Sequence, residues 1–175
     1  LELSQEIKIY EKILKRSDFE AHIAPHTLEI ASMFSVLSRL KETQKCDILT
    51  KMKIYNGDDV IEKGRIKKVD IKDLREENIN EGMSGISTRF IMKSIDNALS
   101  DSDRNIITPI SIMESLTRQV KEQIIDEEFK GKCLELIQKV VREEYLKMLE
   151  NEIAKAFITA YEEQAQALFD TYLDN

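Results

Sequence analysis

The C-terminal part of the chain, residues 126–175, constrains the fold most, because it contains no proline and a single glycine, Gly131. Its composition predicts helix throughout. Apolar residues recur there at helical spacing in two stripes. The first comprises Phe129, Leu134, Ile137, Val141, Tyr145 and Met148, and the second Ile153, Phe157, Ala160, Tyr161, Leu168, Phe169 and Tyr172. We expect two long helices, bent or turned near Glu150 and Asn151.

These stripes need a covering surface, which could be each other, the N-terminal helices or a second subunit. Packing in the core is the favoured interpretation.

The N-terminal part is also predicted to be helical. Leu3, Ile7, Tyr10 and Leu14 indicate a helix that ends near Lys15 or Arg16. The predicted fold class is therefore all-α.

A second helix is predicted with Pro25 in its first turn. It carries the apolar side chains of Ile30, Met33, Phe34, Leu37 and Leu40 and should lie in the core.

Shorter elements follow in the middle of the chain. Asp47 is predicted to cap a short helix that Gly57 stops, and residues 58–68 are predicted to be a charged, exposed loop with a short hairpin. Asp70 could cap a brief helix through Leu74. Thr108 is the predicted N-cap of a helix that begins at Pro109.

Charge and composition exclude several classes of protein. The net charge of -7 argues against a nucleic-acid-binding surface over much of the molecule. No apolar run is long enough to cross a bilayer, so no membrane association is predicted. Cys46 and Cys133 are far apart and form no Cys-x-x-Cys pair, as expected of reduced thiols in a cytoplasmic protein.

The sequence offers little support for a metal or a self-contained active site. His22 and His26 have i, i+4 spacing, but Pro25 lies between them and no third ligand is near, so no metal site is predicted. A Gly-x-x-x-x-Gly-Lys-Ser/Thr loop, a dinucleotide fingerprint and the kinase and hydrolase motifs are all missing from the sequence. The chain alone is therefore not expected to turn over a nucleotide.

The candidate functional stretch is residues 82–90, a glycine-containing loop that runs into a helix start. Ser87 and Thr88 can accept hydrogen bonds from the free N–H groups of the first turn. Arg89 would lie in that turn, where its charge opposes the helix dipole and calls for an anionic partner. A phosphate would serve, and so would the carboxylate of Glu76, Glu77 or Glu81. From these residues alone, the carboxylate is the favoured partner.

Several motifs resemble the PrkA family of bacterial serine protein kinases, which are built on an AAA+ ATPase module. The motifs are HIAPHTL at 22–28, FSVLSRLK at 34–41, KMKIYNG at 51–57, LRE at 74–76 and EGMSGISTRF at 81–90. The resemblance covers most of the chain up to about Leu116.

The resemblance implies a helical, AAA+ lid-like subdomain over residues 1–118 and a long-helix extension over 119–175, leading toward a C-terminal kinase-like region. The phosphate-binding motifs would precede this chain. The pattern from Gly85 also resembles the lid of MoxR-type ATPases. On that pattern Arg89 is the sensor 2 arginine, which contacts the terminal phosphates of ATP, with Ser87 and Thr88 supporting it.

The resemblance also implies ATP and Mg²⁺ in the full-length protein, protein substrates and a role in stress response or sporulation. The preceding AAA+ core domain would be a partner of this chain, and the resemblance is compatible with a homo-oligomer. With the family in view, the sensor interpretation is favoured over a carboxylate partner. The alternative function is a non-catalytic helical scaffold in which the stripes from Phe129 to Tyr172 mediate dimerisation or bind a partner and Arg89 is structural.

Overall fold

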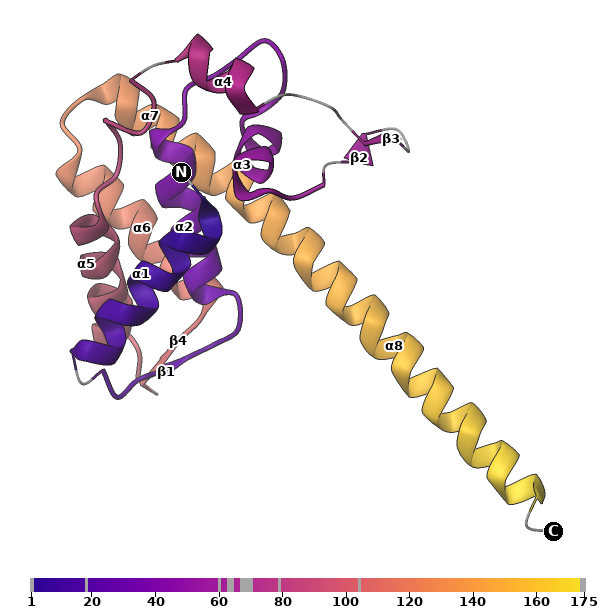
Figure 1. Cartoon of the computed structure of the whole chain (residues 1–175). Coiled ribbons are helices and arrows are strands. Elements are labelled where there is room, and N and C mark those ends of the chain that lie inside the picture. The colour runs from indigo at the N-terminus through magenta and orange to yellow at the C-terminus, as the bar shows by residue number, and fades with distance from the viewer. Residues whose placement is uncertain are drawn as a thin grey trace. The chain divides into compact units, whose positions relative to one another are not determined.

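The computed structural model describes residues 2–17, 19–59, 61–62, 65–66, 71–78, 80–103 and 105–173. Its regular structure is almost entirely helical, which confirms the predicted all-α class (Figure 1). Among the described residues, β-structure is limited to two pairs of two-residue strands.

The first two helices differ in how well the sequence predicts their starts. Helix α1 spans Leu3–Arg16 and ends where its apolar pattern ends, as predicted. Helix α2 spans Thr27–Arg39, so the prediction that Pro25 lies in its first turn is wrong. Pro25 is instead in the preceding turn, and His26 is the N-cap residue in a left-handed conformation (φ 64°). Strand β1, His22–Ile23, precedes this turn.

Helix α3, Ile48–Asn56, begins and ends as predicted. The Asp47 side chain accepts a hydrogen bond from the Thr50 backbone N–H at 2.9 Å, and Gly57 ends the helix with φ 83°. The predicted hairpin is confirmed as strands β2, Ile61–Glu62, and β3, Arg65–Ile66, which pair antiparallel. Helix α4 follows at Ile71–Glu77, and its predicted cap, Asp70, lies outside the described residues.

Helices α5, Thr88–Ser100, and α6, Pro109–Gln123, are joined by a segment that contains strand β4, Ile106–Ile107. Thr108 is the N-cap of α6, as predicted, and forms a reciprocal capping box with Ser111. Strand β4 pairs with β1 in parallel, His22 opposite Ile106. This pair therefore joins two segments that are distant in the sequence.

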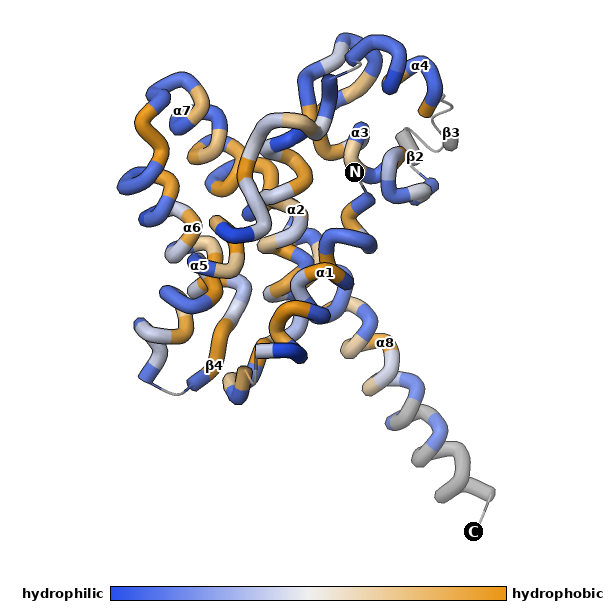
Figure 2. The backbone as a smooth tube through the Cα atoms, turned by 60° about the vertical axis from the view of Figure 1, so that its left-hand side comes forward, coloured by the Kyte–Doolittle hydropathy of each residue, from blue (hydrophilic) through white to orange (hydrophobic). Residues whose placement is uncertain are grey.

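The core is organised around α2, which packs against α1, α3, α5 and α6 (Figure 1). Hydrophobic residues recur along α2, α5 and α6, whereas α4 is mostly hydrophilic (Figure 2). Burial of each large aliphatic side chain contributes about 1.5–3 kcal/mol. Residues with essentially no exposed surface include Tyr10, Ile30, Phe34, Leu37, Leu74, Ile91, Ile107, Ile112, Leu116, Val120, Cys133 and Val141.

The C-terminal helices differ from the prediction. Helix α7, Glu127–Glu135, runs into a π-helix, η1, Leu136–Val141, which is followed by α8, Arg142–Leu173. The predicted bend near Glu150 and Asn151 is wrong, since both residues lie inside α8 and no proline, glycine or cap interrupts the helix there.

The two predicted stripes have different environments. In the first, Ile137 and Val141 are buried. In the second, the described members Ile153, Phe157, Ala160 and Tyr161 are exposed, so core packing is the wrong interpretation for them. The side chains of Leu168, Phe169 and Tyr172 lie outside the described residues.

The chain divides into two compact units, Leu1–Val141 and Arg142–Asn175, here called unit 1 and unit 2. Unit 1 holds all elements up to η1, and α8 is the helix of unit 2. A functional boundary between residues 118 and 119 stays a prediction. Over the described part of the chain, every helix is too short or too polar to cross a membrane.

Candidate functional site

The loop at residues 82–87 ends at the N-terminus of α5, as the sequence predicts. The Ser87 hydroxyl accepts a hydrogen bond from the Phe90 backbone N–H at 3.3 Å, so Ser87 is the N-cap. Thr88 is the first helical residue and does not cap the helix. Arg89 follows in the first turn, where backbone N–H groups and the helix dipole attract anions.

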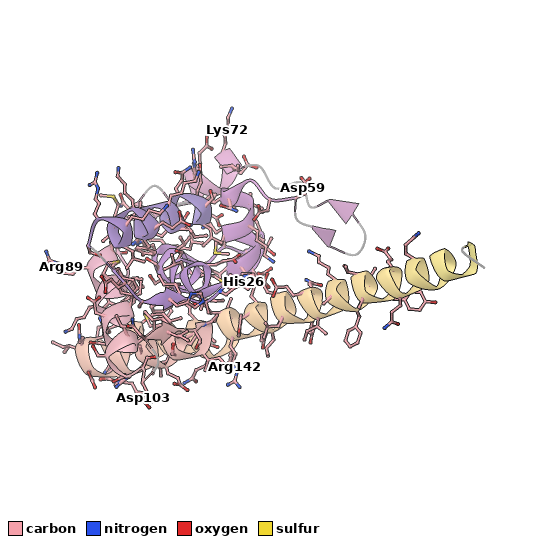
Figure 3. The ribbon with its side chains drawn as sticks, turned by 90° about the horizontal axis from the view of Figure 1, so that it is seen from below. His26, Asp59, Lys72, Arg89, Asp103 and Arg142 are labelled. Carbon is pink, nitrogen blue, oxygen red and sulfur yellow. The ribbon has the colours of Figure 1, made fainter. Side chains whose placement is uncertain are left out.

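Arg89 is exposed, and its side chain points away from the ribbon (Figure 3). Within the described residues, no group makes a hydrogen bond or ion pair with its guanidinium. The carboxylate interpretation is wrong within the described residues, because Arg89 pairs with none of Glu76, Glu77 and Glu81. Glu81 bonds Lys51 and Glu77 accepts a hydrogen bond from Thr43 instead. Arg89 is thus available to an anion from outside the described part of the chain.

Lys93 extends the same side of α5. It lies four residues after Arg89, so the two side chains are neighbours on the helix surface. Lys93 is also exposed and, like Arg89, has no bonded partner among the described residues. Two cations without a bonded partner among the described residues therefore lie near this helix start, in a protein of net charge -7.

A buried polar group, here called the Arg39 cluster, lies on one side of the loop. It comprises Glu6 and Tyr10 of α1 and Ser35 and Arg39 of α2. The Arg39 guanidinium donates to both Glu6 carboxylate oxygens, at 3.1 and 2.9 Å, and to the Ser35 hydroxyl at 2.9 Å. Tyr10 donates to Glu6 at 2.6 Å. Arg39 also donates from Nε to the Ile86 carbonyl oxygen at 2.9 Å, which ties the loop to this cluster.

Burial and hydrogen bonds together set the protonation states of Glu6 and Tyr10 in the Arg39 cluster. Burial alone would raise the pKa of Glu6, but hydrogen bonds from Tyr10, Arg39 and Ser35 outweigh it and lower the pKa below its ordinary value of 4.5. Burial and the neighbouring Glu6 carboxylate raise the pKa of Tyr10 well above its usual range. Tyr10 therefore stays a hydrogen-bond donor and Glu6 stays ionised at neutral pH.

A second group, here called the Lys51 cluster, lies at the other end of the loop and comprises Lys51, Tyr55 and Glu81. The fully buried Lys51 ammonium donates to Glu81 at 2.5 Å and to the Lys41 carbonyl oxygen at 2.9 Å. Tyr55 donates to the other Glu81 oxygen at 2.7 Å. Burial opposes ionisation of Glu81, yet the hydrogen bonds from Lys51 and Tyr55 lower its pKa. Burial and the neighbouring Glu81 carboxylate raise the pKa of Tyr55.

The backbone of the loop also fits closely against the end of α2. The Gly82 N–H donates to the Arg39 carbonyl oxygen at 3.2 Å, and the Ile86 N–H donates to the Ser38 hydroxyl at 3.0 Å. A Cβ at Gly85, whose φ is 126°, would lie 2.7 Å from Arg39 Cγ and 2.8 Å from the Ser38 carbonyl oxygen. Glycine is therefore required there by both conformation and space.

Helix α5 is fixed to α6 behind this loop by buried polar contacts. Ser94 donates to the Gln119 side-chain oxygen at 2.8 Å, and Gln119 donates to the Phe90 carbonyl oxygen at 3.0 Å. Ser115 donates to the Ser94 carbonyl oxygen at 2.8 Å. The first turns of α5 are thus held from the α6 side, while the loop before them is held by α2 and, through Glu81, by α3.

Sequence reasoning missed both clusters. Their members are far apart in the sequence, and no local signal identifies Glu6 as the partner of Arg39. For Glu81, a weak signal was its position directly before the Gly82 loop.

The histidine prediction can also be compared with the structure. His22 is in β1, and the His26 ring lies 2.8 Å from Glu29, while the described residues form no group of three metal-ligating side chains.

The two lowered glutamate pKa values predict an acid-labile fold. The unfolded chain takes up protons at a higher pH than folded Glu6 and Glu81, so their contribution is fully present above about pH 5 and is lost as pH falls through the folded-state values. We expect urea unfolding to show stability falling as the pH is lowered below about 5. The double variant Glu6→Gln/Glu81→Gln should have a shallower dependence. An unchanged slope would contradict this assignment.

The comparisons with known proteins concern the whole chain. Residues 1–47 match the family model described as the PrkA AAA domain, and residues 49–175 match that of the PrkA serine protein kinase C-terminal domain. The chain is 38% identical over 179 residues to the ATP-dependent protease PrkA of Bacillus subtilis (strain 168), covering 100% of this chain and 28% of that protein. It is 34% identical over 176 residues to the serine/threonine kinase YeaG of Escherichia coli (strain K12), covering 99% of this chain and 27% of that protein.

The chain therefore spans little more than a quarter of the length of these curated relatives. No solved structure matches it.

Proposed function

Because the chain belongs to the PrkA family of serine protein kinases, we propose that residues 1–118 form the helical lid of its AAA+ module, with residues 119–175 as an extension toward the C-terminal region. The lid would couple ATP binding and hydrolysis on a preceding AAA+ core to that region. In this proposal Arg89 contacts the terminal phosphates of the bound nucleotide.

The observation that carries the proposal is the continuity of unit 1 across the boundary of the two family models. Helices α1 and α2 lie in the segment that matches the AAA domain, whereas α5 and α6 lie in the segment that matches the C-terminal domain. Both segments contribute to one core, and β1 pairs with β4 across the boundary. A displacement of the AAA segment would therefore move the start of the C-terminal segment with it.

The chemistry of the α5 start supports the role of Arg89. An exposed guanidinium at a helix N-terminus, without a carboxylate partner among the described residues, is suited to bind a phosphate through two parallel hydrogen bonds. Ser87 supports it by capping the helix, and Thr88 is the first residue of that helix. The terminal phosphates of ATP would supply the anion, and the same contact could stabilise negative charge during hydrolysis.

The nucleotide and Mg²⁺ would be held mainly by the preceding core domain, since this sequence has no phosphate-binding loop. Phosphoryl transfer to protein substrates is a proposal for the whole protein. One curated relative is named an ATP-dependent protease and another a serine/threonine kinase. The lid role is compatible with both names, because it concerns the use of ATP and not the reaction that ATP drives.

The test is Arg89→Ala in a full-length protein that contains this chain. We expect ATP hydrolysis to fall at least about tenfold, equivalent to about 1.4 kcal/mol of transition-state stabilisation, while equilibrium ATP binding changes little. Steady-state hydrolysis and binding of a fluorescent ATP analogue measure the two effects. The control is Arg16→Ala, which removes an exposed arginine at the end of α1. Equal turnover in wild type and Arg89→Ala would overturn the proposal.

A second candidate function, a helical scaffold, is favoured by one feature of unit 2. Ile153, Phe157, Ile158 and Tyr161 of α8 are each more than half exposed, which is unusual for large apolar side chains close together on a helix. Such a surface suits dimerisation or binding of a partner. Were Arg89→Ala to have no effect, light scattering on wild type and Phe157→Glu would test this function.

A further inference from the structure

Arg39 connects the two segments that the family models separate. It is the last residue of α2, in the segment that matches the AAA domain, and it bonds Ile86, in the segment that matches the C-terminal domain. We infer that Arg39 is a positioning residue that sets the place of Arg89 through the loop before α5. This inference rests on the proposed function.

The contact between α2 and the loop fixes both backbone hydrogen-bonding groups of Ile86. Arg39 Nε donates to the Ile86 carbonyl oxygen at 2.9 Å, and the Ile86 N–H donates to the Ser38 hydroxyl at 3.0 Å. Ile86 itself is buried and directly precedes Ser87, the N-cap of α5. The position of Arg89, three residues later, follows from this attachment.

Arg39 is in turn held rigidly by the rest of its cluster. Its two terminal nitrogens bond both Glu6 carboxylate oxygens, and one of them also bonds Ser35. The guanidinium thus bonds Glu6 of α1 through its two terminal nitrogens and the Ile86 carbonyl oxygen of the loop through Nε. A lysine could keep the ion pair with Glu6, but its single nitrogen could not also reproduce the Nε bond to Ile86.

The placement of Arg89 depends on this attachment because its own side chain has no partner among the described residues. Helix α6 holds the far side of the helix start through the Gln119 bond to the Phe90 carbonyl oxygen, so the attachment to Arg39 sets the place of the helix start on the side of the loop. Groups that contact a reacting phosphate lose much of their effect when displaced by about 1 Å. A change at Arg39 should therefore reduce hydrolysis through Arg89.

Gly85 provides an independent way to disturb the same contact. An added Cβ would lie 2.7 Å from Arg39 Cγ and 3.0 Å from Arg39 Cα. Gly85→Ala therefore pushes the loop away from α2 without removing any member of the Arg39 cluster. Gly131→Ala is its matched control, because an added Cβ at that helical position meets no atom within 4 Å.

The experiment compares Arg39→Lys, Arg89→Ala and the double variant in the full-length protein. We expect Arg39→Lys to lower kcat for ATP hydrolysis about fivefold, with ATP affinity unchanged within about twofold, since only the helix start moves. The double variant should hydrolyse ATP no more slowly than Arg89→Ala alone, because both changes remove one effect. Gly85→Ala should show the same pattern and Gly131→Ala should behave as wild type.

Each outcome decides a different claim. If Arg89→Ala lowers hydrolysis but Arg39→Lys and Gly85→Ala hydrolyse at the wild-type rate, the positioning role is overturned and the lid proposal stands. The positioning role is also overturned if the double variant loses hydrolysis by the product of the two single-variant factors. Such a product means that the two changes act independently and their free-energy effects add. If Arg39→Lys does not fold, as judged by circular dichroism, the Gly85→Ala pair decides. A fully active Arg89→Ala overturns both proposals.

Discussion

Replacing Lys51 by methionine will lower the free energy of unfolding by about 3–5 kcal/mol, although methionine has a similar length and is apolar. The Lys51 side chain has no exposed surface, and its ammonium bonds Glu81 and the Lys41 carbonyl oxygen. Without it, the Glu81 carboxylate stays buried with no cation beside it in the described part of the chain, where only Tyr55 and the Lys41 N–H still donate to it. The cost of leaving one charge unpaired exceeds the gain from burying an apolar side chain.

Urea unfolding of the chain followed by circular dichroism measures this loss. Lys12→Met is the matched control, since Lys12 is exposed on α1, and it should change stability by no more than about 0.5 kcal/mol. The double variant Lys51→Met/Glu81→Gln should recover part of the loss because it removes the unpaired charge. A loss below about 1 kcal/mol for Lys51→Met would show that the Lys51 cluster contributes little.

Replacing Glu6 by alanine will lower the free energy of unfolding by about 3 kcal/mol, near the lower end of the range for breaking a buried ion pair. Glu6 accepts from three side chains, those of Tyr10, Ser35 and Arg39. Its removal leaves the largely buried Arg39 guanidinium without a counter-charge. The fully buried Tyr10 hydroxyl would keep only its 3.0 Å bond to Ser35.

The control for this change is Glu11→Ala, which removes an exposed carboxylate from the same helix and should be nearly neutral. Thermal and urea unfolding should both give the order of decreasing stability wild type, Glu11→Ala, Glu6→Ala. Hydrogen exchange should also become faster at the Ile86 N–H in Glu6→Ala, since the loop loses a fixed Arg39. Equal stability of the two alanine variants would mean that the Arg39 cluster does not hold the fold.

The helix boundaries could be predicted where a side chain satisfies the backbone within one turn. Asp47, Ser87 and Thr108 each accept a hydrogen bond from a backbone N–H three residues later, so a few adjacent residues encode each start. The family was also predictable from ordered motifs, and the comparisons confirm it.

The sequence misled where no local signal decides the outcome. Nothing in it marks Glu150 and Asn151 as a turn beyond a change of apolar stripe, and α8 passes through both. Pro25 can start a helix, yet His26 adopts a left-handed conformation and the helix begins afterwards. The carboxylate partner of Arg89 was another such inference, because charge alone does not say which side chains meet.

The sequence by itself determined the helical class, most of the caps and the position of a cation in the first turn of α5. Only the tertiary structure decided that Arg39 pairs with Glu6, 33 residues away, and bonds Ile86, 47 residues away. It also decided that Lys51 pairs with Glu81, 30 residues away. Capping depends on neighbours within a turn, whereas a buried ion pair forms only where distant segments fold together and exclude water.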